Sequence, residues 1–357
     1  MSGSSLDGLD IVCAEFNENG GAWTYEILAA ECYPYTSEWA ARLRDATSLN
    51  ALDYQLLHAD YGHHLGEEVN RFIEEKNLHF RVGLIASHGH TAFHLPAQKM
   101  TAQLGDGAAI AARTGLPVVS DLRALDVAFG GQGAPIVPIG EKLLLGEYPM
   151  LLNIGGIANI SFRQPDGYIA FDICPANRVL NLLAAEEGKE YDEGGSMAAT
   201  GQVHEDLLQK LNALPYYGQA YPKSLANSFG TDEVYPLVLA YGLSTSDALR
   251  TVVEHIVQQV TAAIAGEAGK HYSGPLKLLI TGGGAFNTFL VEQLAAALSP
   301  SGVEVVVPER GLVQYKEALV MALIGVLRWR QENTILSSVT GAQRDSIGGA
   351  LWIGQEA

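Results

Sequence analysis

One carboxylate beside a predicted turn is the strongest candidate for chemistry in this sequence. Asp172 ends the apolar run 168–172, which follows another apolar run, 150–162, after Gln164-Pro165-Asp166-Gly167. Pro-Asp-Gly between two such runs predicts a hairpin, because Pro presets one turn dihedral and Gly supplies the other. We expect the returning strand to carry Asp172 at its C-terminal end, with Pro175 in the first turn of the next helix. A carboxylate there could act as a base or only cap the helix, and the local residues leave both roles open.

Two glycine-bearing segments, one in each half of the chain, could surround an anion such as a phosphate. They are Gly3-Ser4-Ser5-Leu6-Asp7-Gly8-Leu9-Asp10 and Gly282-Gly283-Gly284. Small residues let backbone N–H groups crowd around an anion. Neither segment matches a Walker loop or a dinucleotide fingerprint, and each alone is more often a plain turn. Together, one in each half, they predict a nucleotide held between two domains.

Three histidines follow a short buried strand expected at 82–86. His88, His90 and His94 lack the spacing of known zinc sites, and no cysteine lies near them in the sequence. We therefore expect polar contacts to a ligand, or exposure to solvent, and no metal site.

Charged residues at two further places have both a structural and a functional interpretation. Arg123 stands between Asp121 and Asp126. It could form a structural ion pair, or its planar fork could bind sugar or carboxylate oxygens. Glu317 is expected in the first turn of a long helix, where it could simply interact with the helix dipole.

The bulk composition excludes several classes of protein. The chain has 357 residues, 48% of them hydrophobic, which is enough for two domains with real cores. A net charge of -18 argues against nucleic acid or an anionic membrane as partner. The sequence has no apolar run of the ~20 residues that a membrane span needs and no signal-like start. Three widely spaced cysteines favour reduced thiols, so we expect a cytoplasmic protein.

The elements that must position these residues repeat in the two halves: a strand meander, then helix, strand, helix and strand. In the first half we expect a hairpin at 9–33, helices at 37–44, 53–76 and 107–113, and strands at 82–86 and 118–120. In the second half we expect a hairpin at 150–172, helices at 246–267, from 287 and at 315–331, and strands at 276–280 and 303–307. Two such halves predict an α/β protein with a ligand between its domains.

The glycine-bearing connection 121–138 is the expected hinge. We place domain I at 1–138, with the segment 333–357 packing back on it, and domain II at 139–332. A phosphate loop normally follows a strand, whereas this one begins at Met1. Either a first strand is missing or the start of the gene was placed too late.

These pieces, in this order, resemble the anhydro-N-acetylmuramic acid kinase family over essentially the whole chain. The matching blocks are Met1-Ser2-Gly3-Ser4-Ser5-Leu6-Asp7-Gly8, Ser87-His88-Gly89-His90-Thr91, Leu104-Gly105-Asp106, Gly130-Gly131-Gln132-Gly133-Ala134-Pro135, Asn153-Ile154-Gly155-Gly156-Ile157-Ala158-Asn159, Phe171-Asp172, Thr281-Gly282-Gly283-Gly284, Glu317-Ala318 and Ser338-Val339-Thr340-Gly341-Ala342. The resemblance implies two duplicated actin-like (ribonuclease H-like) domains, with mixed sheets flanked by helices and a cleft between the domains.

The resemblance also implies an activity in bacterial cell-wall recycling. It implies a kinase that uses ATP and Mg²⁺, opens the 1,6-anhydro ring of the sugar with water and phosphorylates O6. Asp172 would be the general base, Gly3 to Asp10 and Gly282 to Gly284 would contact the nucleotide, and Arg123, Glu317 and His88 would contact the sugar. The partners would be the sugar and ATP, with a homodimer possible.

The sequence departs from the family pattern at several places. It has Asp172-Ile173-Cys174-Pro175 where the family commonly has Asp-Thr-Gly-Pro, and Ser4 where Thr is usual. It has Lys223-Ser224-Leu225-Ala226-Asn227-Ser228 where the family has Lys-Ser-x-Gly-Arg-Glu. It also lacks acidic residues just before Glu317. Two alternatives therefore stay open: a kinase of another anhydrosugar such as levoglucosan, and a non-catalytic sensor of sugar or nucleotide.

Overall fold

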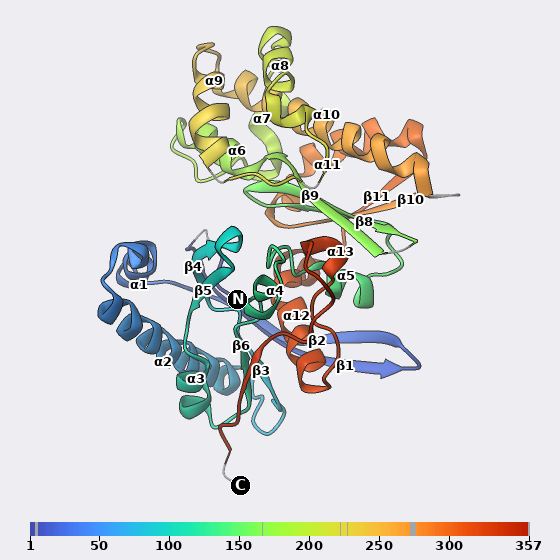
Figure 1. The fold of residues 1–357 in the computed structure, drawn as a ribbon. Helices are drawn as coiled ribbons and strands as arrows, with labels where there is room; N and C mark the ends of the chain where they lie inside the picture. Colours follow the sequence, from blue (N-terminus) through green and yellow to red (C-terminus); the bar gives the residue numbers. More distant parts are fainter. Residues whose placement is uncertain (4–5, 166, 222, 227, 272–275, 356–357) are drawn as a thin grey trace. The chain divides into compact units, whose positions relative to one another are not determined.

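The chain folds into two compact units in the computed structural model shown in Figure 1. The structure describes residues 1–3, 6–165, 167–221, 223–226, 228–271 and 276–355. Unit 1 comprises residues 1–145 and 315–357, and unit 2 comprises residues 146–314. The first boundary therefore follows Leu145 rather than Pro138, and the C-terminal part of unit 1 begins at Tyr315 rather than at 333. Helix α5 (Pro138–Leu144) and most of α12 (Arg310–Trp329) thus belong to unit 1.

Unit 1 contains a long hairpin and a small mixed sheet. Strands β1 (Gly8–Asn19) and β2 (Ala22–Pro34) pair antiparallel. Strand β6 (Val118–Ser120) pairs parallel with β3 (Ile85–Ala86) and antiparallel with β12 (Ala350–Trp352). The expected hairpin and the strand at 118–120 are confirmed, whereas the strand expected at 82–86 is shorter. A second hairpin of β4 (His90–Leu95) and β5 (Met100–Leu104) was not expected.

The helices of unit 1 differ in length, and apolar residues recur with helical spacing in the long ones. They are α1 (Ser37–Arg44), α2 (Ala51–Glu75), α3 (Gly107–Thr114) and α4 (Ala124–Ala128), followed by α5, α12 and α13 (Ser337–Thr340). Asn50 caps α2 by accepting a hydrogen bond from the Asp53 N–H, and α2 buries Leu57, Leu65 and Phe72. Figure 1 shows α2 and α3 packed side by side.

Unit 2 is built on a five-stranded mixed sheet in the order β11-β10-β7-β8-β9. The bounds are Met150–Ile154 for β7, Ile157–Gln164 for β8, Gly167–Pro175 for β9, Leu276–Thr281 for β10 and Val303–Val306 for β11. Strand β7 lies in the middle, antiparallel to β8 and parallel to β10. The predicted α/β class with mixed sheets is therefore confirmed.

The helices of unit 2 surround one long helix, α10 (Thr245–His271). The apolar face predicted at 246–267 is buried there, with Val252, Ile256 and Val260 at 0% exposure. Around α10 pack α6 (Asn177–Ala185), α7 (Ser196–Thr200), α8 (Glu205–Asn212) and α11 (Thr288–Leu298), while α9 (Tyr235–Leu239) packs on α6. This cluster fixes the sheet that carries the candidate residues.

The segment around Asp172 differs from the prediction. Strand β9 does not end at Asp172 but continues to Pro175, and α6 begins only at Asn177. Pro175 therefore closes the strand instead of opening the helix. The reason is that β8 continues alongside, so that Ile157 pairs with Pro175. The predicted turn residue Asp166 lies outside the described residues.

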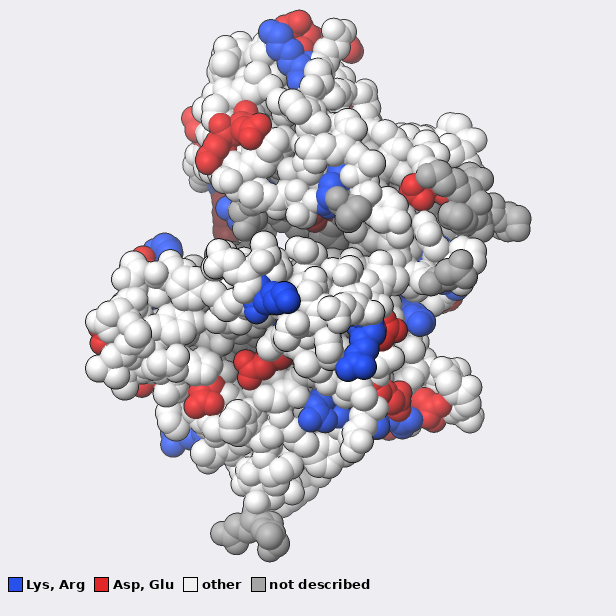
Figure 2. Space-filling model, in the orientation of Figure 1, with Lys and Arg blue, Asp and Glu red and all other residues white. Residues whose placement is uncertain are grey.

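No described helix is long and apolar enough to cross a membrane. Figure 2 shows acidic and basic side chains interspersed over the face in view. This face therefore carries basic side chains as well as acidic ones, although acidic residues are in excess in the sequence.

A buried histidine makes the stability of unit 2 depend on pH. His255 of α10 is fully buried, and its ring nitrogens lie 2.7 Å from Asn212 Oδ1 and 2.9 Å from the Tyr217 hydroxyl. A neutral ring can form both hydrogen bonds: its Nδ1–H donates to Asn212 Oδ1, and its Nε2 accepts from the Tyr217 hydroxyl. Burial lowers the pKa of His255 to about 3.

We expect the free energy of unfolding to fall as the pH drops below about 6.5, the pKa of an unfolded histidine, toward 3. Only the unfolded chain takes up this proton in that range, with a slope of up to about 1.4 kcal/mol per pH unit. The variant His255→Gln should therefore show a smaller difference between its denaturant midpoints at pH 7.5 and pH 5 than the unmodified protein. His79→Gln, whose side chain is 54% exposed, is the control. If the denaturant midpoints of His255→Gln and of the unmodified protein changed equally with pH, this expectation would be contradicted.

Candidate active site

A bulge in β9 sets the direction of Asp172. The pairing with β8 shifts register here: Asn159 pairs with Asp172 and Ala158 with Cys174, which leaves Ile173 unpaired. A bulge adds one residue to one strand, increases the local twist and re-aims nearby side chains. Ile173 and Cys174 are buried in the core of unit 2, whereas Asp172 is only partly buried. The bulge therefore separates a core-facing pair from a carboxylate that keeps some contact with solvent.

The carboxylate of Asp172 is held by a distant backbone group and not by the helix that follows it. Its Oδ2 accepts a hydrogen bond of 2.8 Å from the Leu225 N–H. The residue before α6 is Ala176, and no side chain in the described part of the chain caps this helix. Burial raises the pKa of Asp172, and the Leu225 N–H opposes that rise. The helix-capping interpretation of Asp172 is therefore wrong.

The segment 223–225 runs beside Asp172 and also holds its main chain. The Asp172 N–H donates to the Lys223 carbonyl, and the Tyr216 hydroxyl donates to the Asp172 carbonyl over 2.6 Å. The Lys223 ammonium lies 4.7 Å from the centre of the Tyr216 ring. The segment that departs from the family pattern thus supports the candidate base. Asn227, one of its departures, lies outside the described residues.

Arg178 is a nearby candidate that the sequence analysis did not single out. It lies in the first turn of α6, and its Nε is buried without a hydrogen-bond partner among the described residues. The same Nε would lie 3.6 Å from a Cβ placed on Gly156, in the turn between β7 and β8. A buried guanidinium nitrogen with an open donor is suited to a ligand oxygen. Only this unsatisfied donor, which the sequence does not display, identifies it.

The glycines 282–284 form a tight turn around the end of β7. Gly282 has a φ of +81°, and a Cβ there would lie 2.8 Å from the Ile154 carbonyl oxygen. A Cβ on Gly284 would lie 2.2 Å from Ile154 Cγ2, so only glycine fits. Gly283, in contrast, is exposed. The Gly282 N–H donates to the Val313 carbonyl, so Gly283 and Gly284 are the residues of this turn that could offer main-chain N–H groups to an anion.

In unit 1, the loop Gly3 to Asp10 is described except for Ser4 and Ser5, which lie outside the described residues. Leu6 has a φ of +58°, and its N–H donates weakly to the Gly3 carbonyl, which is typical of a turn. Leu9 is 3% exposed and belongs to the core of unit 1. Its side chain therefore cannot face a nucleotide, and Leu9 could contribute only through its main chain. Gly8 begins β1 and lies too close to Tyr33 for any side chain.

His88 is buried and pairs with Arg123, which is half-buried. The Arg123 Nε–H donates to His88 Nε2 over 2.9 Å, and Arg123 Nη1 donates to the Gly133 carbonyl. His88 Nδ1 lies 2.9 Å from the Gly89 carbonyl, so this nitrogen carries the proton and the ring is neutral. Burial, with the nearby charge of Arg123, lowers the pKa of His88 to about 3. Both ring nitrogens of His88 have partners inside the protein, so the ring holds the Arg123 guanidinium and has no nitrogen left for a further hydrogen bond.

Acidic residues near Arg123 balance its buried charge. Burial lowers the pKa of Arg123 to about 10, and the negative charges of Glu317 and Asp126 limit this lowering of the pKa. Asp126 is fully buried and accepts hydrogen bonds from the Gly133 N–H and the Thr340 hydroxyl. Glu317 is exposed on α12, past its first turn. The structure thus brings His88, Arg123 and Glu317 together in unit 1.

The other two histidines make polar contacts inside unit 1. The Ser2 hydroxyl lies 3.2 Å from His90 Nδ1, and the Thr101 hydroxyl lies 3.1 Å from His94 Nδ1. The His90 contact joins the loop at the chain start to the segment that carries His88.

Comparison with known proteins assigns the chain to a family. The family model described as anhydro-N-acetylmuramic acid kinase matches residues 1–354. The chain belongs to this family. The anhydro-N-acetylmuramic acid kinase of Hydrogenovibrio crunogenus is 32% identical over 369 residues, covering 99% of this chain and 96% of that protein. The enzyme of the same name from Gloeobacter violaceus is 34% identical, covering 96% of this chain and 95% of that protein. The resemblance found in the sequence is therefore confirmed.

Similarity to solved structures is more distant. The activator of the 2-hydroxyisocaproyl-CoA dehydratase from Clostridium difficile with bound ADPNP is 13% identical, with a TM-score of 0.43. That match covers 90% of this chain and 96% of the other.

The glycine turn gives a prediction with a matched control. Gly284→Ala should lower the free energy of unfolding by about 1–3 kcal/mol, because the new methyl overlaps Ile154 in a packed core. Gly283→Ala should change it much less, since the nearest atom to the new Cβ is the Asn177 side-chain nitrogen at 3.4 Å. Denaturant unfolding measures both variants. Equal losses in the two variants would mean that the packing against Ile154 does not restrict this turn.

Proposed function

We propose that the protein is an ATP-dependent kinase that opens and phosphorylates anhydro-N-acetylmuramic acid. Water opens the 1,6-anhydro ring, and the γ-phosphoryl group of ATP is transferred to O6, which gives N-acetylmuramic acid 6-phosphate for peptidoglycan recycling. Family membership supports this proposal, and so do the names of relatives that match nearly the whole chain.

The observation that carries the proposal is the carboxylate of Asp172, partly buried on a bulged strand and held by one N–H. A general base works best when its pKa lies near the working pH, and burial raises the pKa of Asp172 in that direction. We assign Asp172 to accept a proton from the attacking water. The water oxygen bonds to the anomeric carbon, the bond between that carbon and O6 breaks, and O6 takes the phosphoryl group.

The nucleotide contacts follow from the two glycine segments. Phosphoryl transfer depends mainly on positioning and on neutralising charge at the phosphate oxygens. We assign the main chain of Gly3 to Asp10, and that of Gly282 to Gly284, to the nucleotide. Mg²⁺ in such sites usually binds phosphates, waters and one or two carboxylates. Asp7, just before β1, and Asp10, in β1, are carboxylates of this kind. Burial raises the pKa of Asp10, and the nearby charge of Asp7 adds to that rise, so the two carboxylates lie close together. When bound, the ion would neutralise charge on the phosphates.

The sugar contacts come from unit 1. Arg123 uses Nε and Nη1 inside the protein, which orients its guanidinium. Nη2 donates to no group among the described residues and can therefore bind a ligand. The lactyl carboxylate of the muramic sugar is a matching partner for this group. We assign Glu317, exposed near Arg123, to the sugar hydroxyls, and His88 to the orientation of Arg123.

Replacing the base gives the first test. Asp172→Asn should lower kcat by at least about 100-fold, because general base catalysis contributes 10²–10⁴-fold. ATP affinity should stay within about twofold, since no nucleotide contact is removed. Steady-state assays with anhydro-N-acetylmuramic acid, with titration of ATP, measure both values. Undiminished turnover in this variant would exclude Asp172 as the base, and absence of turnover in the unmodified protein would contradict the proposed function.

Replacing Arg123 tests the sugar assignment. Arg123→Lys should raise KM for anhydro-N-acetylmuramic acid by about 10-fold or more, because lysine lacks the planar fork. With levoglucosan, which has no lactyl carboxylate, the same change should have little effect. Arg113→Lys, at a surface pair with Glu67, is the control. An equal rise in KM with both sugars would show that Arg123 does not bind the lactyl carboxylate.

A further inference from the structure

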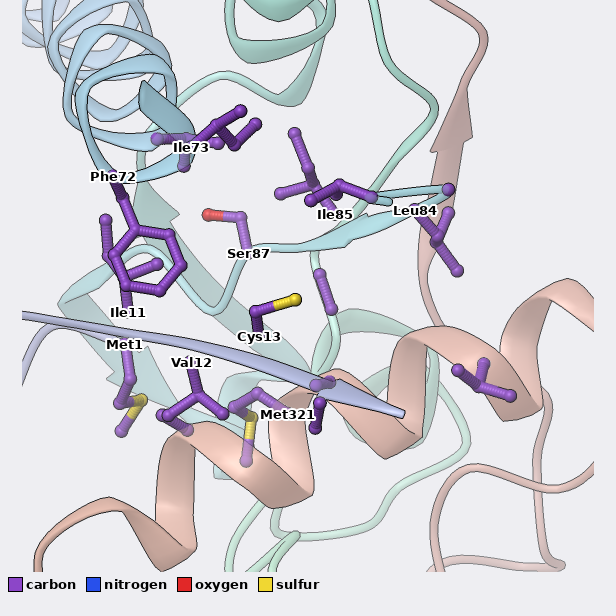
Figure 3. Close-up of a pocket in the computed structure, with 18 of the residues that line it drawn as sticks. Met1, Ile11, Val12, Cys13, Phe72, Ile73, Leu84, Ile85, Ser87 and Met321 are labelled. Carbon is purple, nitrogen blue, oxygen red and sulfur yellow. The ribbon is translucent and has the colours of Figure 1, made fainter. Parts of the chain in front are cut away.

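A cavity of about 500 Å³ inside unit 1 is lined mainly by apolar side chains and does not suit a phosphate group. Figure 3 shows it between β1 and the β3 segment, and the side chains labelled there are apolar except for Cys13 and Ser87. The phosphate groups of a nucleotide instead need fixed N–H donors or cations. Unit 2 has such a group in Arg178, to which the assignments above give no role.

The side chain of Arg178 lies on the turn that joins β7 to β8. A Cβ placed on Gly156 would lie 3.6 Å from Arg178 Nε and 4.0 Å from its Nη2. These two nitrogens form one edge of the planar fork, which can bind two oxygens of a phosphate at once. Nε is buried and has no hydrogen-bond partner among the described residues, while the side chain as a whole is half-buried. The guanidinium is therefore positioned by the fold and still has an open donor.

The main-chain N–H groups around Arg178 are already paired, so the open donor belongs to its side chain. The Ala176 and Arg178 N–H groups donate to the Gly156 carbonyl. The Asn177 N–H donates to the Gly155 carbonyl. The N–H groups that the start of a helix usually offers to an anion are thus occupied at α6. An anion at this corner of unit 2 must be bound by the guanidinium.

The order of the strands places Arg178 between two parts of unit 2 that are assigned to the reaction. Strands β7 and β10 are parallel neighbours, so the turns that follow them lie at the same edge of the sheet. Strand β9 ends at that edge too, because it is antiparallel to β8, which starts there. Along this edge come the turn Gly282 to Gly284, then Gly156 with Arg178, and then β9 with Asp172. A phosphate chain that runs from the glycine turn toward Asp172 brings its terminal group to Arg178.

The segments assigned to the nucleotide contain no cationic side chain. Gly3 to Asp10 includes two aspartates and neither lysine nor arginine, and Gly282 to Gly284 consists of glycine alone. Negative charge on the oxygens of a phosphoryl group in transfer is stabilised by a cation that is already in place. Arg178 can supply that cation from within unit 2.

We propose that Arg178 is a catalytic residue that donates through Nε and Nη2 to oxygens of the phosphoryl group transferred from ATP. This inference rests on the proposed kinase function and adds a cation to it. In the transfer, a bond forms between O6 and the γ-phosphorus. The bond from that phosphorus to the bridging oxygen breaks, and its electron pair leaves with ADP. Arg178 stays protonated throughout and stabilises charge on the other oxygens.

Three variants separate this role from a structural one. Arg178→Met keeps an unbranched apolar side chain and removes the guanidinium. Because a buried N–H without an acceptor costs free energy, its removal should not weaken the fold. Arg178→Lys keeps the charge but lacks the fork. Arg250→Met is the matched control, since Arg250 is also half-buried in unit 2 but pairs with Glu254.

Calorimetry without sugar, in the presence of Mg²⁺, measures binding of ADP and of the non-hydrolysable imido analogue of ATP. We expect Arg178→Met to weaken binding of the ATP analogue by at least about 10-fold and to leave ADP binding within about twofold. Steady-state assays should show kcat lower by at least about 100-fold, with Tm unchanged or higher without ligand. Arg178→Lys should retain only part of kcat, and Arg250→Met should change neither nucleotide affinity nor kcat.

Equal weakening of ADP and of the ATP analogue in Arg178→Met, or a kcat within about threefold of the unmodified protein, would overturn the proposal. A marked fall in Tm would show that the guanidinium supports the fold, and would overturn it as well. The binding measurements need no sugar. They are therefore distinguishable from failure of the proposed function, which would appear as absent turnover of anhydro-N-acetylmuramic acid by the unmodified protein.

Discussion

Strand β7 is the constraint on which the candidate residues of unit 2 depend. It pairs on one side with β8, which sets the register of Asp172, and on the other side with β10, which leads into the glycine turn. Its last residue, Ile154, packs against Gly284, and its carbonyl accepts from the Asn177 side chain at the start of α6. A shift of one residue in β7 would reverse the faces of its side chains and break all three relations at once.

In unit 1 the corresponding constraint is electrostatic. Arg123 is half-buried, and a charge partly removed from water is tolerated only when hydrogen bonds and opposite charges compensate its desolvation. Neutral His88 and the Gly133 carbonyl accept its hydrogen bonds, and Glu317 and Asp126 supply negative charge. A buried ion pair, Lys316 with Glu141 at 2.8 Å, joins α12 to α5 in the same unit. The cost of these buried charges is consistent with a site that must present one fixed cation to an anionic ligand.

How far the sequence predicts the structure depends on the range of the interactions involved. Helices α2 and α10 agree with the prediction to within a few residues, because their signals, apolar spacing and caps, are local. The hairpin of β4 and β5 was missed because its first strand is polar and carries two histidines. The predicted end of β9 at Asp172 was wrong, because the pairing with β8, and not the local sequence, decides where the strand ends. The predicted boundary at 138 differs from the observed one after Leu145, because α5 packs within unit 1. No linker signal in the sequence reveals this contact.

The candidate site divides in the same way. Residue types and motif order identified Asp172, Arg123 and the glycine turn, but not the groups that orient them. The Leu225 N–H lies 53 positions from Asp172 in sequence, and His88 lies 35 positions from Arg123. Neither separation matches a periodicity that a sequence could display. His88 was consequently predicted at the sugar, although its nitrogens are occupied within the protein.

The departure at Ile173 and Cys174 is compatible with a working base. Where the family commonly has Thr and Gly, these two residues are buried in the core, and neither adopts the positive φ that would require glycine. The bulge at Ile173 turns the chain without that flexibility, and a β-branched residue is well suited to an extended backbone. Among the described residues no hydroxyl takes the place of that of Thr on Asp172, and its Oδ2 accepts from the Leu225 N–H. The carboxylate is therefore oriented by the neighbouring segment 223–225, so changes in that segment and in the bulge must be considered together.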